Sequence, residues 1–225
     1  MWFIILLSIA IIFTVGYWLI ISTEGVFLGS RLVIWLYDFT AHRYDEIKEF
    51  DPEWEKFFVA RPLLYKLRAI PAPRVLDVAT GTGRVPALLL EQPTFHGKVF
   101  GVDASSRMLQ LAAQKLSEFP YRTSLIQQSA AGLPFPAQTF DAVTCLESLE
   151  FFPSDKMALQ EMVRVLKPGG ILMVTRRRGW EGKLFISRYK NVAQFEQMLT
   201  AFGLEEVNTQ PWQFSYDQVY GRKPL

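Results

Sequence analysis

The sequence predicts an α/β fold, in which a mainly parallel sheet is covered by helices on both faces and is preceded by one transmembrane helix. Three observations lead to this prediction. The first is a charge-free apolar segment at residues 1–23, and the second is a glycine-containing turn at residues 75–86. The third is the alternation of strand and helix patterns that follows this turn. A chain of 225 residues accommodates one such domain and a segment in front of it.

The N-terminal segment predicts a membrane anchor. Residues 1–23 contain no charged side chain, and they exceed the roughly 20 apolar residues that cross a bilayer core. A cleaved secretory signal is one alternative, but it requires a positive n-region and a small-residue cleavage site, and this segment has neither. A buried core helix is the other alternative, which the length disfavours. We therefore expect an uncleaved single-pass anchor, with Trp2 and Trp18 near its two ends.

Charge and cysteine content indicate the side of the membrane. Arg31, Arg43 and Lys48 follow the anchor, and the positive-inside rule then favours a cytoplasmic C-terminal domain. The chain has one cysteine, Cys145, which excludes an intramolecular disulfide and agrees with a reducing compartment. A net charge of +2 gives no indication of a nucleic-acid partner, and we expect none.

Residues 24–70 are expected to form connecting helices and a lid before a domain at residues 71–225. The apolar run Val26–Tyr37 is too interrupted to span a membrane, so we interpret it as an interfacial helix or as part of the lid. Residues 53–69 have apolar side chains at helical spacing, with a break expected at Pro62. Pro71 and Pro73 end this helix ahead of the first strand.

The central motif begins with the apolar strand Val75–Val78 and passes through Gly81 and Gly83 into a helix. Glycines permit the unusual backbone angles of such a turn and the close approach of a ligand. A dinucleotide fold would have a third glycine where Pro86 stands. Asp77 would repel a phosphate but not an ammonium group. The alternative is an ordinary strand-to-helix turn with a capping Asp.

This pattern resembles the first motif of the class I S-adenosylmethionine-dependent methyltransferases, Asp-x-x-x-Gly-x-Gly. The resemblance implies a Rossmann-like sheet of seven strands in the order 3-2-1-4-5-7-6, with S-adenosylmethionine as cofactor and no metal. It places Asp77 near the methionine end of the cofactor, and it makes Gly81 and Gly83 the floor under the cofactor. It extends from about Tyr37 to the C-terminus and is greatest with the small-molecule and lipid branch, methyltransferase type 11. Residues Tyr37–Asp45 resemble the aromatic-Asp segment that closes over the cofactor in that family, and Tyr44 is the candidate lid residue. A solvated amphipathic helix is the alternative for this segment.

Asp103 ends the second expected strand, Lys98–Asp103. An acid about 20 residues beyond a glycine turn can accept both hydroxyl groups of a ribose, which NAD and S-adenosylmethionine both contain. The alternative role is the N-cap of the next helix. The resemblance places Met108 of that helix against adenine.

The third expected strand, Thr123–Gln128, leads into a loop where the family has Asp-Ala-x-x-Leu-Pro-Phe. Ser129 replaces the Asp, so we expect a weaker adenine contact there or one made by the backbone.

The fourth strand, at residues 139–145, is followed by Glu147 and Glu150. They resemble the acids of a Glu-Val-Leu-Glu-His variant, with Phe151 in place of the His. These two acids are weak candidates for a general base, and a structural role is equally open.

The rest of the chain continues the same pattern. A helix over Asp155–Leu166 precedes Leu-Lys-Pro-Gly-Gly, a specific feature of the family, which we interpret as a turn before a fifth strand at Ile171–Thr175. The basic interval 176–190 is open to three interpretations: a substrate cap, a contact with anionic headgroups or a solvated loop. A helix over Asn191–Ala201 precedes a closing hairpin of strands at residues 204–209 and 214–220.

The resemblance implies methyl transfer from S-adenosylmethionine to a small acceptor that is hydrophobic or resident in the membrane. An NAD-linked oxidoreductase and a non-catalytic ligand-binding protein remain alternatives. Cys145 is interpreted as a buried strand residue beside the cofactor rather than a nucleophile. The expected cofactor-binding residues are Tyr44, Asp77, Ala79, Gly81, Thr82, Gly83, Asp103, Ala104, Met108, Ser129, Ala130 and Cys145.

Overall fold

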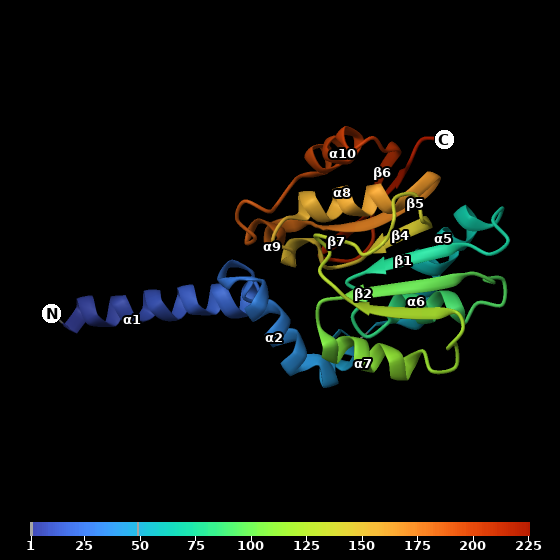
Figure 1. The fold of residues 1–225 in the computed structure, drawn as a ribbon. Helices are drawn as coiled ribbons and strands as arrows, with labels where there is room; N and C mark the ends of the chain where they lie inside the picture. Colours follow the sequence, from blue (N-terminus) through green and yellow to red (C-terminus); the bar gives the residue numbers. More distant parts are fainter. Residues whose placement is uncertain (1, 49) are drawn as a thin grey trace.

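The computed structural model describes residues 2–48 and 50–225 and contains a seven-stranded sheet with helices on both faces (Figure 1). The strand order, β3-β2-β1-β4-β5-β7-β6, is the order that the resemblance implied. The first five strands are parallel, and β7 pairs antiparallel with both β5 and β6. The strands are β1 Arg74–Val78, β2 Lys98–Asp103, β3 Thr123–Gln127, β4 Phe140–Cys145, β5 Leu166–Arg177, β6 Glu205–Pro211 and β7 Tyr216–Arg222.

The sheet separates two apolar cores. All six residues of β4 are buried, as expected for a central parallel strand that is covered on both faces. One core lies between the sheet and helices α8 (Asp155–Val165) and α10 (Val192–Ala201). The other lies against α5 (Arg61–Leu67) and α6 (Arg84–Leu90). Helix α7, Ser106–Lys115, packs along β2 and β3.

Side-chain caps begin several of these helices. The Ser105 hydroxyl accepts the Met108 N–H at the start of α7, so Asp103 is not the N-cap of that helix. Asn191 and Gln194 form a reciprocal capping box at the start of α10. These caps place the strand-to-helix turns, including the turn that follows β2, at defined positions.

Two expectations about local structure are corrected. Strand β5 begins at Leu166 rather than Ile171, and the expected turn lies inside it, where Gly169 has a φ of +74° and the register with β4 shifts. Pro62 does not break the preceding helix. A π-helical turn, Lys56–Ala60, precedes it, and the Arg61 N–H bonds to the Lys56 carbonyl. This wider turn lets the helix continue where Pro62 has no N–H of its own.

The N-terminal helix projects away from the domain (Figure 1). Helix α1, Trp2–Tyr17, continues into a π-helical turn at Trp18–Ser22. Together they form a helix of 21 residues that is long and apolar enough to cross a membrane. Its most apolar stretch of 18 residues has a mean hydropathy of 2.6, and none of that stretch is buried. The Trp18 indole N–H donates to the Leu184 carbonyl at 3.2 Å, which joins the base of this helix to the domain.

Short helices connect this segment to the sheet. They are α2 (Ser30–Thr40), α3 (Tyr44–Lys48) and α4 (Pro52–Glu55). Figure 1 shows α2 on the side of the domain toward which the parallel strands point, which is also the side from which α1 leaves. The carboxyl ends of the strands therefore face the connecting segment.

Substituting Gly83→Ala is predicted to destabilise the fold. Gly83 has a φ of +80°, and an added Cβ would lie 3.1 Å from both Ala112 Cβ and Leu116 Cδ1. Backbone strain and overpacking together predict a loss of about 1–3 kcal/mol in unfolding free energy, measured by urea denaturation of the detergent-solubilised chain. Gly132→Ala is the matched control, because its Cβ would meet nothing within 4 Å. Equal stability of the two variants would contradict the prediction.

Candidate functional site

A cavity of about 210 Å³ lies at the carboxyl ends of β1, β2 and β4. Parallel α/β sheets bind ligands at this edge. Side chains of α2 and α3 form part of its wall, so the connecting segment encloses the cavity against the sheet. The expected residues among its lining are Tyr44, Ala79, Gly81, Asp103, Ala104, Met108, Ser129, Ala130 and Glu147.

The glycine turn forms one wall of this cavity. Ala79 has a φ of +56° and Gly81 a φ of +53°, the left-handed region in which a residue with a Cβ is strained. A Cβ at Gly81 would meet nothing closer than Tyr44 Cε1 at 3.9 Å. The backbone at Gly81 is thus bare toward the lid, and any larger residue would begin to fill the space that a ligand needs.

Asp103 is fixed by two backbone hydrogen bonds. Its Oδ2 accepts the Gly81 N–H at 2.8 Å, and its Oδ1 accepts the Ser105 N–H at 2.9 Å. Burial raises the pKa of this carboxyl, and the backbone hydrogen bonds act in the opposite direction. Each oxygen retains a further lone pair, so the carboxylate can still accept the hydroxyl groups of a ribose.

Asp77 lies beneath the turn, outside the lining of the main cavity. It borders a second, smaller cavity, which also touches Tyr44, Thr82 and Arg84. The Thr144 hydroxyl donates to Asp77 Oδ1 at 2.6 Å. Burial raises the pKa of Asp77 to about 6, while that hydrogen bond lowers it. A positively charged group beside Asp77 would favour its ionised form.

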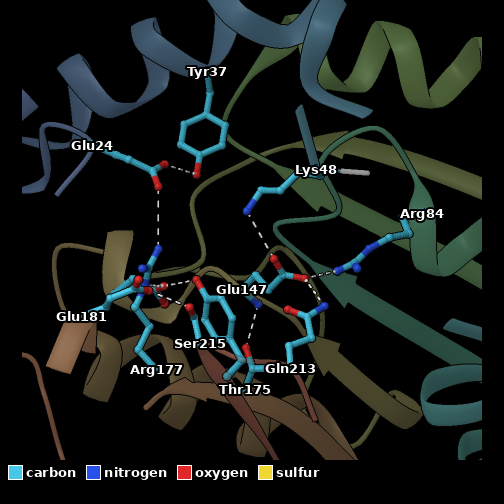
Figure 2. A network of polar contacts seen from close by, with 12 residues as sticks. Glu24, Tyr37, Lys48, Arg84, Glu147, Thr175, Arg177, Glu181, Gln213 and Ser215 are labelled. Carbon is cyan, nitrogen blue, oxygen red and sulfur yellow. Dashed lines mark hydrogen bonds and ion pairs between the residues drawn. The ribbon is translucent and has the colours of Figure 1, made fainter. Parts of the chain in front are cut away.

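Glu147 holds the lid to the sheet (Figure 2). Its carboxylate pairs with Lys48 of α3 at 3.2 Å and with Arg84 of α6 at 3.0 Å, and its N–H donates to the Thr175 hydroxyl at 2.7 Å. Burial opposes ionisation of this carboxyl, but the two cations together hold its pKa below its usual value. A carboxylate paired in this way stays ionised and is a poor proton acceptor.

The lid is fastened at two further points. The Thr82 hydroxyl donates to Asp45 at 2.6 Å, and Lys115 pairs with the same carboxylate. Toward α2, the Ser105 hydroxyl donates to Asp38 at 2.5 Å. The aromatic-Asp segment therefore contacts both the glycine turn and the start of α7.

Three of the expected residues lie outside both cavities. Gly83 packs against α7. Cys145 is completely buried, lies 3.0 Å from the Ser148 hydroxyl and has its thiol pKa raised by burial. Glu150 is held by Arg177 at 2.5 Å and by the Tyr216 hydroxyl, away from the main cavity. Figure 2 shows Arg177 reaching Glu24, which also accepts the Tyr37 hydroxyl at 2.8 Å.

Sequence reasoning missed Arg84, Lys48 and Tyr37. Arg84 follows the second glycine directly, and its position at the start of a helix beside a ligand-binding turn was a usable signal. Lys48 gave no such signal, because its partner Glu147 is 99 residues away. Tyr37 lies at the start of the aromatic-Asp segment, but its hydrogen bond to Glu24 was not predicted. The structure brings Tyr37 and Tyr44 to the cavity wall and Arg84 to the smaller cavity.

Known proteins resemble this chain in sequence. A family model described as a methyltransferase domain matches residues 75–170. A demethylmenaquinone methyltransferase of Bacillus cereus is 31% identical over 188 residues, which cover 68% of this chain and 79% of that protein. One from Symbiobacterium thermophilum is 37% identical, over 60% of this chain and 55% of that protein. A ubiquinone/menaquinone biosynthesis C-methyltransferase of Geotalea daltonii is 32% identical, over 62% of this chain and 60% of that protein. The match thus spans little more than half of some of these relatives.

Solved structures share the fold. The [4+2]-cyclase SpnF superposes with a TM-score of 0.71 at 20% identity, covering 87% of this chain and 96% of that one. A SAM-dependent methyltransferase from Aquifex aeolicus superposes with a TM-score of 0.61 at 21% identity, over 78% of this chain and 95% of that one. At such identities the likeness concerns the fold alone, because one fold supports different activities.

The raised pKa of Asp77 predicts a pH-dependent effect of Asp77→Asn on stability. The folded carboxyl keeps its proton up to about pH 6, against a usual pKa of 3.8, so unfolding releases a proton between these values. Raising the pH through this window therefore lowers the unfolding free energy of the natural chain, by about 2–3 kcal/mol. The Asn side chain does not titrate. In denaturation experiments, the unfolding free energy of Asp77→Asn should therefore increase relative to that of the natural chain as the pH is raised from 4 to 7. A difference between the two unfolding free energies that does not change with pH would contradict this prediction.

Proposed function

This chain belongs to the class I S-adenosylmethionine-dependent methyltransferases, and we propose that it methylates a hydrophobic, membrane-resident acceptor of the quinone type. The observation that carries the proposal is the cavity itself. It joins a bare glycine turn and a fixed acid, Asp103, to an apolar end formed by Val33 and Phe151. One end thus suits a nucleoside and the other a hydrophobic ring.

The residues present fit the cofactor. Asp103 has free lone pairs for ribose hydroxyl groups, and Met108 and Ala130 offer apolar surface for adenine. Beside the smaller cavity, the Asp77 carboxylate suits the ammonium group at the methionine end, whereas Arg84 is already paired with Glu147 and Glu55. When bound, S-adenosylmethionine supplies a methyl group on a positively charged sulfur, which needs little further activation.

The protein's task is then to orient the acceptor and to exclude water. Tyr37, Tyr44 and Phe151 form an aromatic group, with Tyr37 in contact with both others, on the lid side of the cavity. Asp45 and Lys48 fasten the lid over it. We assign Glu147 to this fastening rather than to proton removal, because its two cationic partners keep it ionised.

The acceptor class follows from the relatives and from the N-terminal helix. Several relatives are named for menaquinone or ubiquinone synthesis, and such quinones reside in membranes. We propose that residues 1–23 anchor the chain, that residues 24–70 connect and cover the site, and that residues 71–225 form the catalytic domain on the cytoplasmic side. The apolar span at Trp2–Ser22 supports the anchor.

Transfer of labelled methyl is the direct test of this function. Membranes containing the full chain, supplied with methyl-labelled S-adenosylmethionine and a demethylated menaquinone, should yield label in the lipid extract. Membranes lacking the chain provide the control. Mass identification of the product would give the methylated atom. Binding of NADH without binding of S-adenosylmethionine would instead favour an oxidoreductase, and cofactor binding without transfer to any lipid would favour a non-catalytic protein.

Asp103→Asn is predicted to weaken cofactor binding. The amide would turn an N–H donor toward either the Gly81 or the Ser105 N–H and would remove the charge that strengthens hydrogen bonds to a ribose. Loss of such bonds predicts an affinity lower by about 10- to 100-fold in isothermal titration. Glu118→Gln, an exposed acid after α7, is the matched control. Equal affinity of the two variants for S-adenosylmethionine would contradict a role of Asp103 in cofactor binding.

A further inference from the structure

We propose that the surface formed by Trp180, Lys183, Ile186 and Phe214, here termed the interfacial patch, rests on a bilayer that carries anionic headgroups. This inference depends on the proposed membrane anchor. It adds a second membrane contact, made by the catalytic domain itself, which would hold the cavity at a fixed height and orientation above the bilayer.

The depth of the patch follows from the anchor. A helix of 21 residues at about 1.5 Å per residue is about 30 Å long, which matches the hydrocarbon core. Trp18 is one turn from the end of this helix, and its indole N–H donates to the Leu184 carbonyl. The loop after helix α9 (Gly179–Lys183) is thereby held at the boundary between hydrocarbon and headgroups. Figure 1 shows α9 on the side of the domain from which α1 leaves.

Packing makes this attachment rigid. Phe185 is 1% exposed and packs with Val26 and Phe151, so the loop is tied both to the chain leaving the anchor and to the cavity wall. Arg188 lies 5.7 Å from the ring centre of Phe27. The patch therefore cannot turn away from the anchor without breaking a buried cluster.

The composition of the patch suits a membrane interface. Trp180, Ile186 and Phe214 are large apolar side chains that are 66%, 61% and 86% exposed. Trp180 and Phe214 line the same groove beside α9, with Arg178. Lys183 is exposed and has no ion-pair partner within residues 2–48 and 50–225. Aromatic rings with nearby cations bind at headgroup level, where anionic lipids attract Lys and Arg.

The consequence concerns the route of the acceptor. The cavity is bordered by Ser30 at the start of α2 and by Phe151, which contacts the same buried cluster as Phe185. A patch seated on the bilayer would bring this apolar end of the cavity close to the lipids. An acceptor could then pass from the membrane into the cavity without crossing bulk water.

Site-directed labelling of the full chain in vesicles tests the patch. An environment-sensitive fluorophore is attached to the cysteine of the Ile186→Cys variant. Cys145 does not compete for the label, because it is completely buried. Tyr121→Cys, 89% exposed and just before β3, is the aqueous control, and Val15→Cys within α1 reports whether the anchor is inserted. Vesicles of phosphatidylcholine and phosphatidylglycerol contain a lipid with a nitroxide at headgroup level. We expect most of the emission at position 186 to be lost and that at position 121 to be retained.

The outcomes separate this inference from the proposed function. Quenching at position 186 that falls when phosphatidylglycerol is omitted, or when Lys183→Glu is introduced, supports the patch. An unquenched label at position 186 with a quenched one at position 15 overturns it, even if methyl transfer is measured in the same vesicles. Shielding of the fluorophore at position 186 from water that persists in detergent, and that increases with protein concentration, would assign this surface to a contact with a second copy of the chain. That result also overturns the membrane contact of the patch. Quenching without methyl transfer contradicts only the proposed function.

Discussion

The hydrogen bond from the Gly81 N–H to the Asp103 carboxylate is the constraint on which the site depends. It joins the ends of two neighbouring strands, β1 and β2, and a second bond from the Ser105 N–H fixes the other oxygen. The acid is thus oriented by backbone alone, and no flexible side chain has to be ordered when a ligand binds. The cost is the burial of a carboxylate, which raises its pKa. A ligand with adjacent hydroxyl groups would provide further partners for that carboxylate.

Glu147, unlike Asp103, is held by charged side chains rather than by backbone N–H groups. Its backbone is in the left-handed region, with a φ of +53°, and its carboxylate meets cations from two separate elements, α3 and α6. A buried ion pair contributes little net stability, but removal of one partner is costly, about 3–5 kcal/mol. The arrangement therefore selects one position of the lid relative to β4. Its effect on catalysis would come through the geometry of the closed cavity rather than through proton transfer.

The sequence predicted the parts of the fold that local signals specify. Alternating strand and helix patterns and the glycine turn predicted the α/β class and most element ends, because each depends on neighbouring residues. The strand order, in contrast, was implied by the resemblance to the methyltransferases. The start of β5 at Leu166 was missed because Lys-Pro-Gly-Gly has the composition of a turn, and only pairing with β4 extends it. Arg84 and Lys48 converge on Glu147 from 63 and 99 residues away. No local pattern encodes such pairing, so the fastening of the lid was beyond sequence reasoning.

The direction of the sheet connects the ligand site with the proposed membrane contact. Parallel strands end at one edge, and crossover connections leave the turns there free to bind ligands. The N-terminal segment also reaches the sheet at this edge, since side chains of α2 and α3 line the cavity that the strand ends form. Helix α1 leaves the domain on the side of this edge (Figure 1), so a membrane that contains α1 would face the cavity. If the helix is anchored as proposed, this orientation would hinder access of a water-soluble acceptor and would shorten the path of one dissolved in the bilayer, in agreement with the proposed lipid-soluble acceptor.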